Sequence, residues 1–227
     1  MEMGEYAARR DILSSEEGLF QIPLRKEYLL SRIGRGKRVL DLGCLGGKIS
    51  KLIQDRNNDV WCVELNAAAA ELAKSRGLKV KVANVEEGIP FESESFDVVN
   101  AGELIEQIYD TKAVLLECAR VLKRGGTLFL ATPNLNSLEN RIRVLTGGYL
   151  ATVGAYPEDH FGEHVRVFNR AKLNELLQQC GFQIREVRGI PTLRSRGRWL
   201  DRGLGWVGRV WPDGSQLLVV RAERHLL

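Results

Sequence analysis

The chain has 227 residues, 44% of them hydrophobic and 27% charged, and a formal net charge of +4 at pH 7. These fractions are ordinary for a globular protein, and the length suits one α/β domain with a sizeable core. There is no apolar run long enough to cross a bilayer, and the amino terminus lacks the pattern of a signal peptide. Four cysteines without ligand spacing predict buried thiols and no metal site, so we expect a cytoplasmic protein.

In chain order, hydrophobic patterning predicts an alternation of strands and helices. A polar arm or lid helix is expected at 5–17, and an amphipathic helix at 21–32. The predicted strands are 38–42, 59–64, 78–83, 96–100, 127–131, 183–187 and 216–220. The predicted helices are 47–56, 67–76, 111–123, an inserted helix at 135–145, and a helix from Asn169 to Cys180. This alternation indicates a doubly wound, parallel α/β sheet.

A glycine-rich turn follows the first predicted strand, in the segment 39–47 (V-L-D-L-G-C-L-G-G). Its spacing does not fit the dinucleotide fingerprint G-x-G-x-x-G, and it does not fit the phosphate loop either. An acid at the strand end, Asp41, is badly placed against a pyrophosphate and well placed against a cation. Glycines here are expected to let the backbone approach a ligand closely.

This segment resembles the first motif of the class I S-adenosylmethionine-dependent methyltransferases. Asp41, Gly43, Cys44 and Gly47 match the motif, whereas Leu45 stands where that family usually has a glycine. The resemblance implies a Rossmann-like methyltransferase fold with a mostly parallel seven-stranded sheet. It also implies one domain over 1–227, with cap insertions near 134–165 and 190–214.

The ends of the second and third strands supply candidate cofactor ligands. Glu64, followed by Leu65, can accept both ribose hydroxyls, although a solvated acid before a helix is an equal alternative. Asn84 replaces the acid that takes the adenine amino group in the resembled family. Its amide oxygen can still accept that hydrogen bond, and the N–H of Val85 can donate to the ring.

The fourth strand ends in small residues, and the next segment carries two carboxylates. The carbonyls of Ala101 and Gly102 could hold the methionine ammonium. The segment 103–107 (E-L-I-E-Q) resembles the E-x-x-E-H of quinone-pathway O-methyltransferases, with Gln107 in place of the histidine. The two carboxylates are expected to share one helical face, where they either serve a base or metal site or orient the cofactor amine or a lid.

Methyl transfer from a sulfonium is a direct displacement and needs a base only when the nucleophile is not already free to react. The sequence offers no compelling base. His160 is the better candidate, since it lies in a loop expected to roof the pocket, while His164 in H-V-R-x-F reads as structural.

The segment 193–211 interleaves five arginines with three tryptophans. That pattern suits an anionic lipid surface or a phosphate-bearing substrate, and we expect a mobile lid; a cap packed on the sheet is the alternative. Nucleic acid is disfavoured, because the charge is near balance and no N-P-P-Y element follows the fourth strand.

These features predict a methyltransferase that uses S-adenosyl-L-methionine and releases S-adenosyl-L-homocysteine. The expected acceptor atom is an oxygen or nitrogen of a small molecule, a glycan or a lipid precursor. The alternative is a cofactor-binding accessory protein without transfer activity, since the chain also resembles MetW-like proteins. An NAD-dependent oxidoreductase is disfavoured by the glycine spacing.

Overall fold

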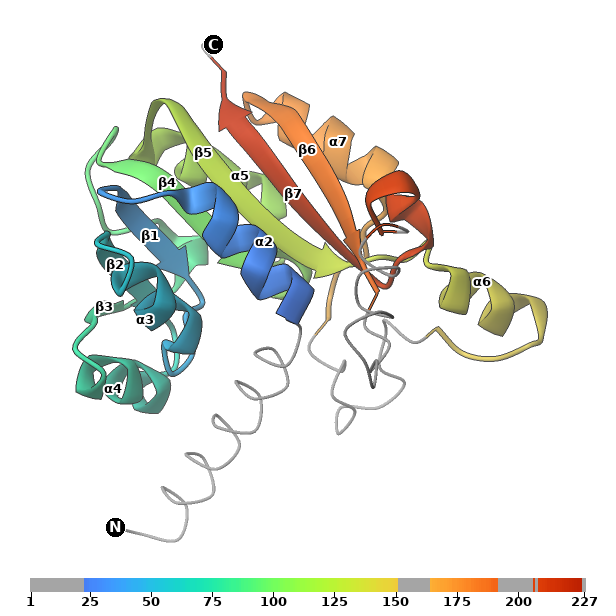
Figure 1. Cartoon of the computed structure of the whole chain (residues 1–227), viewed down its shortest axis with the longest axis horizontal. Helices are drawn as coiled ribbons and strands as arrows, with labels where there is room; N and C mark the ends of the chain where they lie inside the picture. Colours follow the sequence, from blue (N-terminus) through green and yellow to red (C-terminus); the bar gives the residue numbers. More distant parts are fainter. Residues whose placement is uncertain (1–22, 151–163, 192–205, 207, 226–227) are drawn as a thin grey trace, which may run out of the picture.

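The computed structural model describes residues 23–150, 164–191, 206 and 208–225 (Figure 1). The predicted arm at 5–17, the base candidate His160 and most of the predicted lid at 193–211 lie outside the described residues.

The strands are β1 (Arg38–Leu42), β2 (Asp59–Glu64), β3 (Lys79–Val82), β4 (Phe96–Gly102), β5 (Leu122–Pro133), β6 (Phe182–Ile190) and β7 (Leu217–Arg224). The helices are α2 (Pro23–Ile33), α3 (Lys48–Gln54), α4 (Ala67–Ser75), α5 (Thr111–Val121), α6 (Leu138–Leu145) and α7 (Arg170–Gln179). The 3-10 turns are η1 (Val85–Glu87), η2 (Ile105–Gln107) and η3 (Pro212–Gly214).

The strands form one seven-stranded sheet in the order β3-β2-β1-β4-β5-β7-β6. The first five strands pair in parallel, as the alternation predicts. β7 enters between β5 and β6 and runs antiparallel to both. The predicted mostly parallel sheet is therefore mixed, because the late strand returns as the second arm of an antiparallel pair with β6.

Helices cover both faces of the sheet (Figure 1). Side chains of α2, α3 and α4 pack on one face with alternate strand residues such as Val39 and Phe129. Side chains of α5 and α7 pack on the other face with the intervening residues, such as Leu40 and Leu128. Successive strand residues point to opposite faces, so each central strand is buried on both sides and is largely apolar. The doubly wound prediction is confirmed.

Side-chain caps fix the starts of three helices where the sequence predicts them. The oxygen of Asn66 accepts from the N–H of Ala69 at 3.1 Å, which satisfies a free donor of α4. Asp110 caps α5 through the N–H of Ala113, and Asn169 caps α7 in the same way. The start of β5 was mispredicted: α5 runs directly into the strand at Leu122, which pairs with Phe96 ahead of a register shift.

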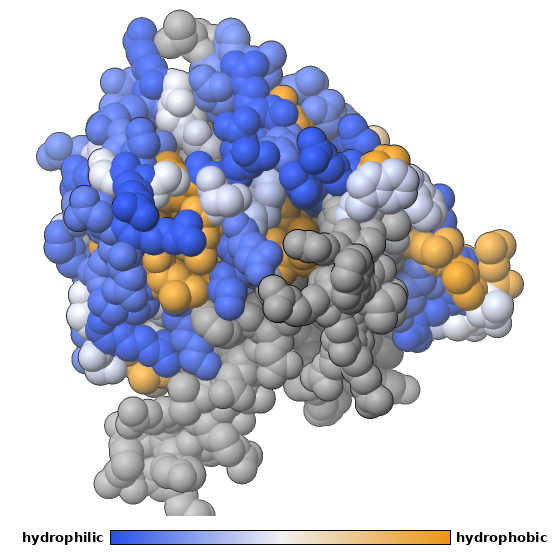
Figure 2. All heavy atoms as spheres, in the orientation of Figure 1, coloured by the Kyte–Doolittle hydropathy of each residue, from blue (hydrophilic) through white to orange (hydrophobic). Residues whose placement is uncertain are grey.

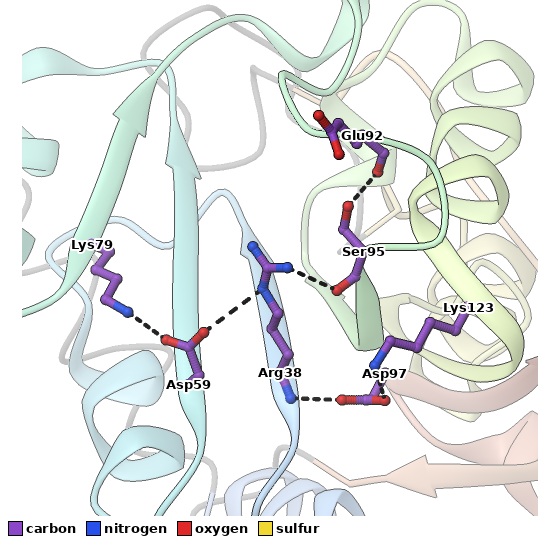
Figure 3. A network of polar contacts seen from close by, with 7 residues as sticks. All are labelled: Arg38, Asp59, Lys79, Glu92, Ser95, Asp97 and Lys123. Atoms are coloured by element: carbon purple, nitrogen blue, oxygen red, sulfur yellow. Dashed lines mark hydrogen bonds and ion pairs between the residues drawn. The ribbon is translucent and has the colours of Figure 1, made fainter.

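An ionic network ties together the amino ends of the strands (Figure 3). Asp97 accepts from the backbone N–H of Arg38 at 2.8 Å and from Lys123 at 2.9 Å. Asp59 accepts from Lys79 at 2.6 Å and faces the Arg38 guanidinium at 3.7 Å. These contacts brace the edge of the sheet opposite the carboxyl ends of the parallel strands, where an α/β sheet binds its ligand.

The chain leaves the sheet after β5 and returns to the same place before α7. The N–H of Leu135 donates to the carbonyl of Phe168 at 2.8 Å. The N–H groups of Val165 and Arg166 both donate to the carbonyl of Glu106, at 2.9 and 3.0 Å. The H-V-R-x-F element thus returns to the carboxyl edge of the sheet. In the described part of the chain no helix has the length and apolar character needed to cross a membrane.

Candidate functional site

The glycine turn follows β1 and bends back over the sheet edge. The N–H of Gly43 donates to the carbonyl of Val63 at 2.9 Å, which joins the turn to β2. Gly43 and Gly47 have φ values of 67° and 83°, in the left-handed region. Leu45 also lies there, with φ 49°. The loop therefore keeps at Leu45 a backbone conformation that glycine adopts readily. A residue other than glycine pays about 1–2 kcal/mol of backbone strain in that conformation.

Packing, as well as backbone conformation, requires Gly47. A Cβ there would overlap the Cδ1 of Leu78 and lie 3.0 Å from the Cβ of Ala73. The glycine therefore lets the start of α3 approach α4 and the start of β3. This differs from the expectation that the glycines serve ligand access, because the atoms nearest to Gly47 belong to the protein core.

Asp41 is buried at the end of β1 and binds two neutral side chains. One carboxylate oxygen accepts from the Ser50 hydroxyl of α3, and the other accepts from the Asn100 amide of β4 at 2.7 Å. Burial raises the pKa of Asp41 above its ordinary value, while the hydrogen bonds from Ser50 and Asn100 oppose that rise. Asp41 thus connects β1, α3 and β4 beneath the turn.

Glu64 is buried at the end of β2, with 6% of its surface exposed. Its Oε2 accepts from the N–H of Leu45 at 2.8 Å, and its Oε1 accepts from the N–H of Asn66 at 2.8 Å. The alternative of a solvated acid is therefore wrong. Each oxygen keeps a further lone pair, and the next side chain, Leu65, is 67% exposed.

The end of β3 leads into a short helical turn. The amide oxygen of Asn84 accepts from the N–H of Glu86 at 3.0 Å and so caps η1. Val85 is buried, and the side chain of Glu86 accepts from the N–H of Tyr109 at 2.7 Å. Asn84 therefore holds the turn in place while its oxygen retains one lone pair for another donor.

A pocket opens at the carboxyl ends of β1 and β4. It is lined by Arg25, Asp41, Gly43, Cys44, Leu45, Lys48, Ile49, Asn100 and Gly102. Arg25 comes from α2, is only 8% exposed, and forms an ion pair with Glu103. Its guanidinium lies against the backbone of Gly102, where any side chain would collide with it. Ala101 is buried just before this point.

The carboxylates of Glu103 and Glu106 do not share a helical face, contrary to expectation. Glu103 precedes η2 with a left-handed φ of 56° and points to Arg25. Glu106 is buried, its Oε2 accepts from the Thr132 hydroxyl at 3.1 Å, and its Oε1 has no hydrogen-bond partner among the described atoms. Burial raises the pKa of Glu106 from 4.5 to about 8, so the acid is mostly protonated at neutral pH.

Gln107 ends η2, where the resembled quinone-pathway motif carries a histidine. Among the described residues, no three histidine, cysteine or acidic side chains are grouped as ligands of a metal ion. The four cysteines are buried and free, as the sequence predicts. His164 lies at the start of the returning segment and immediately precedes Val165, whose N–H donates to the carbonyl of Glu106.

Arg25, Ser50 and the side-chain role of Asn100 were not identified from the sequence, and of these three residues Arg25 and Asn100 line the pocket. Arg25 lies in an amphipathic helix, where an arginine normally indicates a solvent face. Ser50 and Asn100 bind Asp41, and only the folded arrangement brings them together. The one available signal was position, because Asn100 ends a predicted strand at the ligand-binding edge.

Comparisons with known proteins identify the family of this chain. Residues 40–130 match the methyltransferase domain family. The chain is 30% identical, over 79% of its length, to the ubiquinone biosynthesis O-methyltransferase of Xanthomonas oryzae pv. oryzae, and the match covers 78% of that protein.

Solved structures of methyltransferases share the fold. One is an S-adenosylmethionine-dependent methyltransferase of Thermotoga maritima, with a TM-score of 0.69 and 19% identity over 95% of this chain and 97% of the other. Another is the Burkholderia thailandensis 1,6-didemethyltoxoflavin-N1-methyltransferase, which was solved with S-adenosylhomocysteine bound. Its TM-score is 0.63, with 19% identity over 100% of this chain and 92% of that one. The chain therefore belongs to the S-adenosylmethionine-dependent methyltransferases.

Proposed function

We propose that this methyltransferase binds S-adenosyl-L-methionine at the carboxyl ends of β1, β2, β3 and β4, and methylates an oxygen or nitrogen of a small acceptor. The observation that carries the proposal is the ion pair of Arg25 and Glu103 beside the pocket. A guanidinium and a carboxylate next to each other complement the carboxylate and ammonium of a zwitterionic amino acid. The methionine end of the donor has this charge pattern.

The Arg25 guanidinium would bind the donor carboxylate. Glu103, together with the carbonyls of Ala101 and Gly102, would accept from the ammonium. In the turn, Gly43 and Cys44 line the pocket and would face the methionine chain, while Gly47 would hold the turn in position through its close packing. Asp41 fixes that turn to α3 and β4. The pair of Arg25 and Glu103 would thus supply a cation and an anion for the two charges of the donor.

The nucleoside would extend over the ends of β2 and β3. Glu64 has lone pairs left for the two ribose hydroxyls, because each of its oxygens accepts only one backbone N–H. Leu65 would cover the adenine through its exposed side chain, and Asn84 would accept from the adenine amino group. The N–H of Val85 would donate to the ring.

When bound, the donor supplies a methyl group already activated by a sulfonium. The protein then has to align the acceptor with that methyl group and exclude water. We keep His160 as the candidate base, in a segment outside the described residues. Glu106 holds its proton at neutral pH and is therefore a poor base there.

The acceptor is proposed to be a small molecule, a glycan or a lipid precursor, and not a nucleic acid. The name of the Xanthomonas relative, ubiquinone biosynthesis O-methyltransferase, favours an oxygen acceptor. We further propose one domain over 1–227, and peripheral membrane contact through 193–211. The four buried, free cysteines support a cytoplasmic location.

The test is transfer of label from methyl-labelled donor to small acceptors, including catechols and lipid extracts. We expect labelled product and S-adenosylhomocysteine in equal amounts, and loss of both in Arg25→Gln. Tight donor binding without any transfer across broad extract fractions would instead indicate the accessory, MetW-like role.

A further inference from the structure

Helix α6 turns its apolar side chains away from the protein. The helix follows β5 and projects from the body of the molecule (Figure 1). Leu138, Ile142 and Leu145 are spaced four and three residues apart and so form one stripe. They are 46%, 53% and 86% exposed, and Figure 2 shows an orange, apolar surface over α6.

The side of α6 that faces the protein is polar. Asn140 is 1% exposed and donates to the carbonyls of Asn134 at 3.2 Å and Leu135 at 3.0 Å. Its N–H donates to the Ser137 hydroxyl at 3.2 Å. A surface helix normally buries its apolar stripe and exposes its polar side. Here hydrogen bonds hold the helix in the reverse orientation, which leaves the apolar stripe exposed.

Aromatic and basic residues continue this surface toward η3. Trp211 is 42% exposed, and the Arg141 guanidinium lies 5.9 Å from the centre of its ring. Val210, beside Trp211 in the chain, is 61% exposed, and Arg209 is exposed as well. We call Leu138, Ile142, Leu145, Val210 and Trp211 the α6 ridge.

The charge around the α6 ridge is positive. Of the nearby acids, Glu139 already pairs with Arg143 at 2.8 Å, and Asp213 pairs with Arg170 at 3.4 Å. In the described part of the chain, Arg141 and Arg209 form no ion pair. Apolar side chains and a tryptophan, bordered by arginines whose charge is not neutralised, match the boundary between the headgroups and acyl chains of an anionic bilayer.

We propose that the α6 ridge docks the protein on an anionic lipid surface. The leucine, isoleucine and tryptophan side chains enter the acyl boundary while Arg141 and Arg209 meet lipid phosphates. The ridge and the donor pocket belong to the same edge of the sheet, since α6 follows the carboxyl end of β5 and Gly102 ends the neighbouring β4. This placement would admit an acceptor from the lipid phase, a use that rests on the proposed methyl transfer.

Vesicle sedimentation with the full chain tests the docking without donor or acceptor. The probes are vesicles of phosphatidylcholine alone and of phosphatidylcholine mixed with phosphatidylglycerol. We expect binding to the anionic vesicles, weakened by added salt, and a loss of about tenfold or more in Ile142→Glu/Leu145→Glu. The matched control Leu116→Glu, at a 42% exposed leucine of α5, should bind as wild type does.

Any of three results would overturn the proposal. The first is a wild type that does not bind anionic vesicles, and the second is a double variant that binds them as well as the wild type does. The third is a wild type that forms a dimer and does not bind vesicles, with the dimer lost in the double variant; a second copy of the chain would then be the occupant. Titration of S-adenosylhomocysteine into the double variant checks that this variant folds. If it binds S-adenosylhomocysteine normally but does not bind vesicles, the docking has failed while the donor site is intact.

Discussion

The carboxylate of Glu64 at the end of β2 accepts a hydrogen bond from the backbone N–H of Leu45 in the glycine turn at 2.8 Å. The same side chain reaches the N–H of Asn66 at the start of α4 with its other oxygen. One acid therefore sets the position of two loops at the ligand-binding edge. It also presents its remaining lone pairs toward the proposed ribose site.

Glu64→Ala should weaken both the fold and the donor site. Two part-buried backbone N–H groups lose a charged acceptor, and hydrogen bonds to charged groups contribute about 1.5–3 kcal/mol each. S-adenosylhomocysteine affinity should fall about tenfold to a hundredfold, because hydrogen bonds to a charged group are removed. Urea unfolding and calorimetric titration measure the two effects. Glu71→Ala, which removes an exposed acid of α4 that pairs with Lys74, should change neither by much. Equal effects in both variants would refute the role of Glu64.

Substitutions of Leu45 test whether the backbone of the glycine turn is strained at this residue. Leu45→Asn should raise the free energy of unfolding by about 0.5–1 kcal/mol, because asparagine tolerates the left-handed region better than leucine. Leu45→Val should lower it, since a β-branched side chain is strained most there. Urea unfolding of the three proteins would show this order. The reverse order would mean that contacts of the leucine side chain outweigh its backbone strain.

Alanine substitutions at two glycines with the same φ distinguish the cost of backbone strain from the cost of a packing collision. Gly34 and Gly47 both have φ 83°, but a Cβ on Gly34 meets nothing within 4 Å. Gly34→Ala should therefore cost only the strain, about 1–2 kcal/mol. Gly47→Ala should cost about 1–3 kcal/mol more, through its collision with Leu78 and Ala73. Thermal unfolding gives both values, and equal losses would rule out the packing role of Gly47.

Glu106 predicts a pH dependence of stability. Its pKa rises from 4.5 to about 8 on folding, so the folded state holds a proton that the unfolded state releases. The contribution of this proton to the free energy of unfolding is full below pH 4.5 and falls as the pH rises toward 8. Above pH 8 the free energy of unfolding no longer changes on account of Glu106. The slope is at most about 1.4 kcal/mol per pH unit.

Glu106→Gln should remove that slope, because an amide mimics the protonated acid. Urea unfolding between pH 5 and 8 should show wild type losing stability relative to the variant. Glu117→Gln is the control: hydrogen bonds from Arg120 lower the pKa of Glu117, so its contribution is constant over this range. Parallel curves for wild type and Glu106→Gln would contradict the prediction.

Local patterns in the sequence were enough to predict the sheet and the turn. The caps at Asn66, Asp110 and Asn169 come from short-range hydrogen bonds, so residue type at one position predicts them. Arg25 could not be predicted in this way, since its ion pair joins residues far apart in the chain. The left-handed backbone of Leu45 and Glu103 was also not predictable, because tertiary contacts override the local preference there.

The most direct test of the proposed donor site is calorimetric titration of S-adenosylhomocysteine into wild type, Arg25→Gln and Arg32→Gln. Arg32 lies on the same helix as Arg25 but is exposed and pairs with Glu186 away from the pocket. We predict that wild type binds S-adenosylhomocysteine in preference to NAD, that Arg25→Gln loses about tenfold or more in affinity, and that Arg32→Gln binds normally. Preference for NAD, or equal affinity in all three proteins, would contradict the assignment of this pocket to the methyl donor.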